Sequence, residues 1–207
     1  MIELWSNKKV PVLEDSGLRL RAPKGSDFTA WQNVRAASRS FLTPVEPKWS
    51  EYELTKKSFL KRVKISSQRA SDRTEISLFI FVLETKNTKK TENFVGGITL
   101  SNIRYGAACH SNLGYWLGEK QTKNGYMGKA INLLLPYAFG SLKLRRIHAA
   151  CLPDNLSSKN VLVNTGFEEE GFARDYLQIN GKMRDHLLFG MTKDNFASIK
   201  GDSSKSL

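Results

Sequence analysis

The sequence feature that most constrains the fold is a glycine-bearing loop that joins a strand-like segment to a helical pattern. The loop, GEKQTKNGYMGKA at residues 118–130, follows SNLGYWLG and leads into apolar residues at helical spacing. A strand, such a loop and a helix start together present several backbone N–H groups at the positive end of the helix dipole. The pattern predicts an anion site, although similar loops occur in proteins that bind no ligand. Neither a Walker motif nor G-x-G-x-x-G accompanies it.

The segments on either side of the loop predict a single mixed α/β domain. Three successive strand-like segments precede the loop, and we expect them to pair as antiparallel neighbours. Strands are expected from residue 18 and at residues 75–84, 94–103, 111–118, 145–152, 167–179 and 183–191, and helices at residues 26–42, from about residue 50, at 127–138 and at 157–166. We assign residues 1–16 to an N-terminal extension, 17–193 to the domain and 194–207 to a disordered tail.

The charge of the chain favours acidic partners. The sequence has 32 Lys and Arg against 20 Asp and Glu, for a net charge of +12. Nucleic acid, a membrane surface and a phosphorylated cofactor all fit this excess, as does an ordinary solvated surface. No apolar stretch reaches the roughly 20 residues of a membrane helix, and Cys109 and Cys151 make no disulfide framework. We expect a cytoplasmic protein without a metal site or a membrane partner.

Several motifs resemble the GNAT N-acetyltransferases, and among them the RimJ/RimL group, which acetylates the N-terminal amines of ribosomal proteins. The resemblance spans about residues 18–191 and rests on LGYWLG, the glycine loop and RRIHAACLPDNLSSKNVLVNTGFEEEG, in the family's order and spacing. SFLTPVEP and RDYLQINGKMRDH resemble the RimJ branch in particular. The resemblance implies a GNAT fold, with a mixed, mostly antiparallel sheet of about six to seven strands, flanking helices and splayed central strands.

The resemblance also implies that acetyl-CoA is the cosubstrate and that the loop holds its pyrophosphate through main-chain N–H groups. In the family's loop pattern, Lys123 stands where the first glycine is expected, and Gly125 is the second. A lysine at that position adds strain if the backbone φ is positive; otherwise its ammonium can face the phosphate. The predicted cofactor-binding residues are Trp116, Leu117, Gly118, Lys123, Asn124, Gly125, Tyr126, Met127, Gly128, Asn155 and Ser158.

Acetyl transfer to an amine needs a neutral nucleophile, a polarised thioester carbonyl and a proton for the leaving thiolate. Leu162 stands where many relatives carry a tyrosine proton donor, and the resemblance to the RimL branch assigns this role to Ser158. Asn155 can orient substrate or cofactor. Helix capping is the alternative for Ser158, and a turn role for Asn155. Leu177 stands where the RimL branch has a glutamate, so Glu46 is the candidate to meet the acceptor's ammonium, with a solvated loop glutamate as the alternative.

We therefore predict transfer of an acetyl group from acetyl-CoA to a protein N-terminal α-amine, on a ribosomal protein. Two alternatives remain: acetylation of a small-molecule amine by the same machinery, and a noncatalytic ribosome- or RNA-associated protein that keeps the fold. The expected partners are acetyl-CoA, the acceptor protein's N-terminus and, through charge, the ribosome or its RNA. The chain is expected to act as a monomer or a homodimer.

Overall fold

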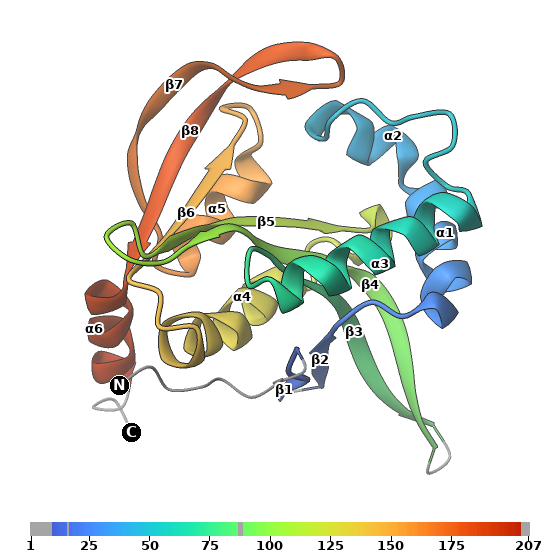
Figure 1. The fold of residues 1–207 in the computed structure, drawn as a ribbon, viewed down its shortest axis with the longest axis horizontal. Coiled ribbons are helices and arrows are strands. Elements are labelled where there is room, and N and C mark those ends of the chain that lie inside the picture. Colours follow the sequence, from blue (N-terminus) through green and yellow to red (C-terminus); the bar gives the residue numbers. More distant parts are fainter. Residues whose placement is uncertain (1–9, 16, 87–88, 204–207) are drawn as a thin grey trace.

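The computed structural model describes residues 10–15, 17–86 and 89–203, and a single sheet organises them (Figure 1). Its order is β1-β2-β3-β4-β5-β6-β8-β7, and every neighbouring pair is antiparallel except β5 and β6, which are parallel. The strands are β1 (Leu13–Asp15), β2 (Leu18–Arg21), β3 (Ile76–Lys86), β4 (Lys89–Arg104), β5 (His110–Leu117), β6 (Arg146–Cys151), β7 (Glu168–Ile179) and β8 (Lys182–Thr192).

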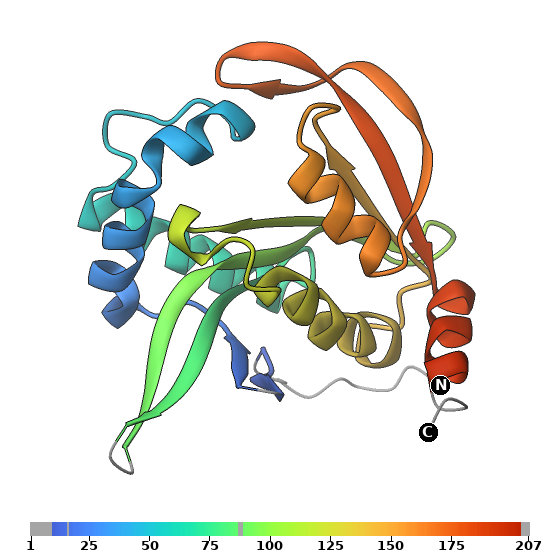
Figure 2. The same ribbon diagram turned by 180° about the vertical axis from the view of Figure 1, so that it is seen from behind.

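The helices cover both faces of the sheet. They are α1 (Phe28–Ala37), α2 (Arg39–Leu42), α3 (Lys56–Ser71), α4 (Tyr126–Pro136), α5 (Leu156–Asn164) and α6 (Lys193–Ser203). Helices α1 and α3 lie on one face, and α4 and α5 lie on the other, as Figure 1 and its reverse view in Figure 2 show. The predicted α/β fold with a mostly antiparallel sheet is confirmed, with eight strands in the described residues instead of six to seven.

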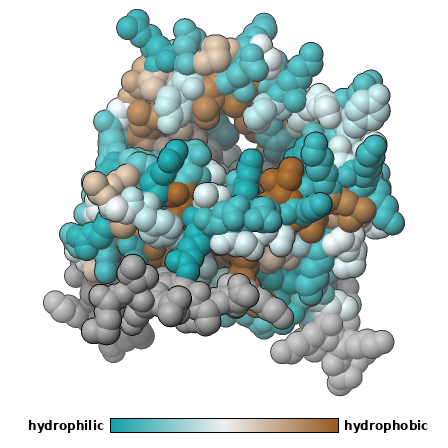
Figure 3. Space-filling model, in the orientation of Figure 1, coloured by the Kyte–Doolittle hydropathy of each residue, from teal (hydrophilic) through white to brown (hydrophobic). Residues whose placement is uncertain are grey.

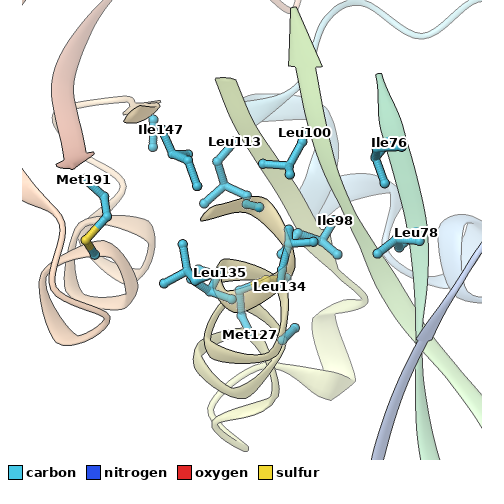
Figure 4. Packing of buried hydrophobic residues seen from close by; sticks show 14 of the residues in the cluster. Ile76, Leu78, Ile98, Leu100, Leu113, Met127, Leu134, Leu135, Ile147 and Met191 are labelled. Carbon is cyan, nitrogen blue, oxygen red and sulfur yellow. The ribbon is translucent and has the colours of Figure 1, made fainter. Parts of the chain in front are cut away.

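Strand alternation explains this two-sided arrangement. Successive side chains of a strand point to opposite faces, so the even-numbered residues of β3, Ile76 to Ile80, pack under α4, whereas Phe79 and Phe81 face α1 and α3. The larger core lies on the α4 side. Its labelled members in Figure 4 are Ile76, Leu78, Ile98, Leu100, Leu113, Met127, Leu134, Leu135, Ile147 and Met191. The apolar stripe of α4 therefore fixes the position of the glycine loop that precedes it.

Two predicted boundaries need correction. Residues 193–203 form α6, although 194–207 were expected to be a disordered tail; residues 204–207 lie outside the described residues. The hydroxyl of Thr192 accepts the N–H of Asn195 and so caps the helix, and Phe196 packs on Phe139 at 5.2 Å between ring centroids. The segment is mostly polar, so its order comes from docking. Similarly, β1 lies within the assigned N-terminal extension and pairs with β2.

The hairpin of β7 and β8 has a turn that the sequence encodes directly. Asn180 and Gly181 both have positive φ, at 47° and 82°, as a two-residue type I′ turn requires. The backbone N–H of Asn180 donates to the carbonyl of Glu46, 2.9 Å away, so the hairpin tip contacts the segment after α2.

Within the described residues, no helix is long and apolar enough to cross a membrane.

Candidate active site

The site lies where the parallel strands β5 and β6 separate. Their pairing runs from His110 with Arg146 to Leu113 with Ala149 and then stops, although both strands continue. Antiparallel alternation directs the backbone groups of β5 in turn towards and away from β4. The N–H of Gly118 donates to the Val95 carbonyl at 2.9 Å, so the N–H and C=O of the preceding residue face the opening. The splayed central strands that the resemblance implied are present, with free backbone groups between them.

The glycine loop ends at the start of α4 with a row of free donors. Gly125 is the N-cap of α4, with φ of 73°, and no side chain caps the helix. In the described part of the chain, none of the backbone N–H groups of residues 123–128 donates to another protein group. Such orphan donors at the positive end of a helix dipole are a chemical match for phosphate oxygens. The loop therefore has the donors that a phosphate group requires, as expected for the predicted pyrophosphate site.

Contacts to α1 and within the loop hold these donors in place. Gly118 must be glycine, because a Cβ there would lie 2.6 Å from Cγ1 of Val34 on α1. The hydroxyl of Ser38, just after α1, accepts the N–H of Glu119 at 2.9 Å. Asn124 donates its side-chain amide to the Thr122 carbonyl at 3.0 Å. These contacts within the protein fix the shape of the loop.

Lys123 adopts the backbone conformation that favours glycine. Its φ is 64°, in the left-handed region, and its side chain is exposed and, within the described residues, forms no ion pair. A non-glycine residue in this region is strained by about 1 kcal/mol or more. The sequence left open whether the backbone φ of Lys123 is positive and therefore strained. The structure shows that it is positive. The ammonium remains free to face a phosphate as well.

Ser158 and Asn155 lie at the start of α5, across the opening from β5. Asn155 is the N-cap, and its Oδ1 accepts the backbone N–H of Ser158 at 3.1 Å. The hydroxyl of Ser158 does not cap the helix. It lies 2.9 Å from the phenol oxygen of Tyr115 on β5. Burial raises the pKa of Tyr115 to about 12, and the hydrogen bond with Ser158 offsets this only in part.

Glu46 lies in the segment that follows α2, where both its carboxylate oxygens are occupied. Arg35 of α1 forms a two-pronged ion pair with it, at 2.7 and 2.8 Å, and the indole N–H of Trp49 donates to it at 2.8 Å. The guanidinium lies between the rings of Trp49 and Trp116, 4.2 and 4.7 Å from their centroids. This cluster fixes the segment whose Glu46 carbonyl contacts the hairpin tip at Asn180. The predicted meeting of Glu46 with the acceptor's ammonium stays a prediction.

The opening between the strands can be reached from one end of the molecule. Figure 3 shows the surface hollowed between the end of the β7–β8 hairpin and α2. Beside Asn155, a cavity of about 300 Å³ lies between the turn before α5 and the start of β8, lined by Pro153, Asp154, Met183, Arg184 and Asp185. Among the described residues, no group of three or more His, Cys, Asp or Glu could hold a metal ion.

Comparison with known proteins decides the family. Residues 17–168 match the family described as an acetyltransferase (GNAT) domain. The chain belongs to the GNAT family. Over 168 residues, 80% of this chain and 84% of the relative, the GNAT chain is 32% identical to the [ribosomal protein uS5]-alanine N-acetyltransferase of Escherichia coli. It is also 39% identical over 99 residues to the probable N-acetyltransferase YjcK of Bacillus subtilis; that match covers 48% of this chain and 55% of YjcK.

Solved structures agree with this GNAT assignment. The ribosomal-protein-S5-alanine acetyltransferase of Vibrio fischeri superposes with a TM-score of 0.80 at 28% identity, covering 90% of this chain and 98% of that one. Mycobacterium smegmatis RimJ in complex with CoA-disulfide superposes with a TM-score of 0.79 at 28% identity, covering 89% and 87%. This GNAT enzyme is an N-acetyltransferase, and acetyl-CoA is its acetyl donor.

Two residues that shape this GNAT site escaped the sequence analysis. Tyr115 shares one face of β5 with Leu113 and Leu117, and no nearby residue indicates the partner of its hydroxyl, which lies 43 residues away. Arg35 lies within an expected helix, where a single arginine gives no sign of a buried ion pair with Glu46. The signal available for Arg35 was its place on the apolar face of that helix, four residues after Trp31.

Proposed function

We propose that the enzyme transfers acetyl from acetyl-CoA to the N-terminal α-amine of a ribosomal protein. The observation that carries this proposal is the 32% identity, over 84% of its length, to the enzyme named [ribosomal protein uS5]-alanine N-acetyltransferase. The serine and asparagine at the start of α5, beside the strand opening, add a chemical reason. A ribosomal acceptor also implies action in the cytoplasm.

In this proposal the chain binds the cosubstrate along the opening. The N–H groups of residues 123–128 hold the pyrophosphate. Of the predicted residues 116–118, the N–H of Gly118 is bonded to Val95, so the backbone groups of Leu117 pair with the pantetheine arm. The thioester then lies near the end of β5, beside the hydroxyl of Ser158. Asn155 holds the first turn of α5 and with it the position of that hydroxyl. The acceptor enters through the hollow between the hairpin and α2.

The chemistry needs little from a general base. An α-amine has a pKa near 7.8, so about a third of it is neutral at pH 7.5, whereas only about 0.1% of a lysine side chain is neutral. The amine nitrogen attacks the carbonyl carbon, the C–S bond breaks, and Ser158 gives its proton to the departing sulfur. The proton lost by the new amide nitrogen returns to the serine oxygen through water.

The test is a panel of acceptors with acetyl-CoA, read by mass spectrometry. Peptides with a free N-terminal alanine or serine are expected to gain one acetyl group. The same peptides with a blocked N-terminus and an internal lysine are expected to remain unmodified. Acetylation of spermidine or another small amine in preference to every peptide would favour the small-molecule alternative instead.

One observation favours a further role in RNA contact. Helix α3 exposes Lys56, Lys57, Lys61 and Lys64, none of which forms an ion pair with a described residue. Lysines one turn apart on a helix can follow a phosphate backbone. Binding of ribosomal RNA that weakens steeply with salt, and that is lost when these lysines become glutamine, would support this role; salt-independent or absent binding would contradict it.

A further inference from the structure

Tyr115 supplies a hydroxyl that the proposed chemistry does not yet use. The residue lies on β5, two positions past the last pair with β6, and its ring packs against the main core. Its phenol oxygen reaches across the opening to α5. There it lies 2.9 Å from the Ser158 hydroxyl and 3.3 Å from the Ser158 carbonyl. The two hydroxyls thus meet where the thioester sulfur is expected.

The direction of this hydrogen bond determines whether Ser158 can act. If the serine donates to the phenol oxygen, its proton is occupied and faces away from the substrate. If the phenol donates to the serine oxygen, which is nearer than the Ser158 carbonyl, the serine proton is released from the phenol and can rotate towards the opening, with the Cys151 thiol as its other hydrogen-bonding neighbour. The Asn155 side chain already accepts the backbone N–H of Ser158, so the serine oxygen is not needed to cap the helix and can accept a hydrogen bond from the phenol.

We propose that Tyr115 is a positioning residue that donates its phenol proton to Ser158 and so turns the serine proton towards the thioester sulfur. The inference rests on the proposed role of Ser158 as proton donor. As the serine proton moves to sulfur, negative charge develops on the serine oxygen, and the bond from the phenol becomes charge-assisted and stronger. Tyr115 keeps its own proton throughout, so the only proton that moves to the sulfur is the one from Ser158.

The burial of Tyr115 keeps its phenol protonated, so the phenol can donate a hydrogen bond over the whole pH range of the assay. Because its pKa is raised to about 12, the phenol remains protonated at every pH at which an α-amine acceptor is assayed. A tyrosine of ordinary pKa near the surface would begin to lose this ability in alkaline buffers. The donor therefore works across the whole range in which the acceptor becomes neutral.

The experiment is a double-mutant cycle of Tyr115→Phe and Ser158→Ala, measured in single turnovers with the enzyme in excess over acetyl-CoA and the peptide saturating. Phenylalanine keeps the ring and removes only the hydroxyl. We expect Tyr115→Phe to lower the rate about tenfold and to leave the calorimetric affinity for acetyl-CoA within about twofold. In the Ser158→Ala background, the same change should have almost no further effect. Tyr137→Phe, which alters another partly buried tyrosine against the same core, is the matched control and should keep the wild-type rate.

The outcomes separate the two proposals. If Ser158→Ala turns over like the wild type, the proton-donor role fails at its source. If Ser158→Ala is slow but Tyr115→Phe is normal, or if the two losses multiply, the serine role stands and the positioning role of Tyr115 is overturned. A Tyr115→Phe loss equalled by Tyr137→Phe would show a general packing effect and would also overturn it.

Discussion

Lys123 combines a left-handed backbone, with φ of 64°, and an exposed ammonium, and its replacement by glycine removes both the strain and the charge. Strain that exists in both the free and the bound state cancels in the binding free energy, so Lys123→Gly should not tighten acetyl-CoA binding. It should raise the free energy of unfolding by about 1 kcal/mol. Loss of the ammonium should weaken binding up to about fivefold at low salt and hardly at all at high salt.

The chain offers a matched control for this prediction. Lys143 is also exposed and has φ of 58°, but it lies away from the loop. Lys143→Gly should give the same gain in chemical denaturation with no change in acetyl-CoA titrations. Tighter binding by Lys123→Gly at every salt concentration would show instead that the ligand imposes additional strain on the loop.

Replacing Glu46 distinguishes between two roles of its carboxylate: holding the segment after α2 in place, and acting as a general base. Because Arg35 and Trp49 occupy both oxygens, we expect Glu46→Gln to loosen the segment after α2 and raise KM for the peptide about tenfold, with kcat within about threefold. Glu53→Gln, which touches Arg35 without contacting the hairpin, should change KM less. A collapse of kcat in Glu46→Gln, with loss of the acidic limb of its pH profile, would support the role of base.

At the scale of elements, α6 shows how a polar segment gains order from its docking site. Phe196 packs on Phe139, and Asn195 donates to Glu168 at 2.7 Å. Phe196→Ala should cost about 2 kcal/mol and lower the melting temperature by about 4–8 °C for a chain of this size. Ser198→Ala, on the exposed side of the same helix, should melt like the wild type. Equal melting of both variants would contradict the docking of α6.

At the scale of the whole molecule, the buried phenol of Tyr115 links stability to alkaline pH. Its folded pKa of about 12 lies above the ordinary value of 10.0, so the folded state holds the proton more tightly than the unfolded chain. The stabilising effect is complete below pH 10 and is lost as the pH rises towards 12. Urea unfolding of wild type and Tyr115→Phe should therefore diverge above pH 10, with the wild type losing stability faster. Parallel curves would contradict the raised pKa.

Local patterns in the sequence determined the elements and part of the site. Alternation predicted the strands, and helical spacing predicted α4 after its glycine loop, because both depend on neighbours a few residues apart. The three-residue interval from Asn155 to Ser158 likewise belongs to the first turn of one helix. The predicted strands and α4 are present in the structure, because each depends on a pattern of residues that are close in the sequence. At the start of α5, Asn155 is the cap, although capping was the alternative considered for Ser158. The roles assigned to the loop, the serine and the asparagine remain predictions.

Tertiary structure alone decided the contacts between distant segments. The separation of β5 from β6, the docking of α6, the Arg35–Glu46 pair and the contact of Glu46 with Asn180 all depend on register and packing between elements. Alternation could assign Tyr115 to a face of its strand, but only the placement of α5 brings Ser158 to its hydroxyl. The physical reason is that a side chain's direction is a local property, whereas its partner is selected by the packing of the entire chain.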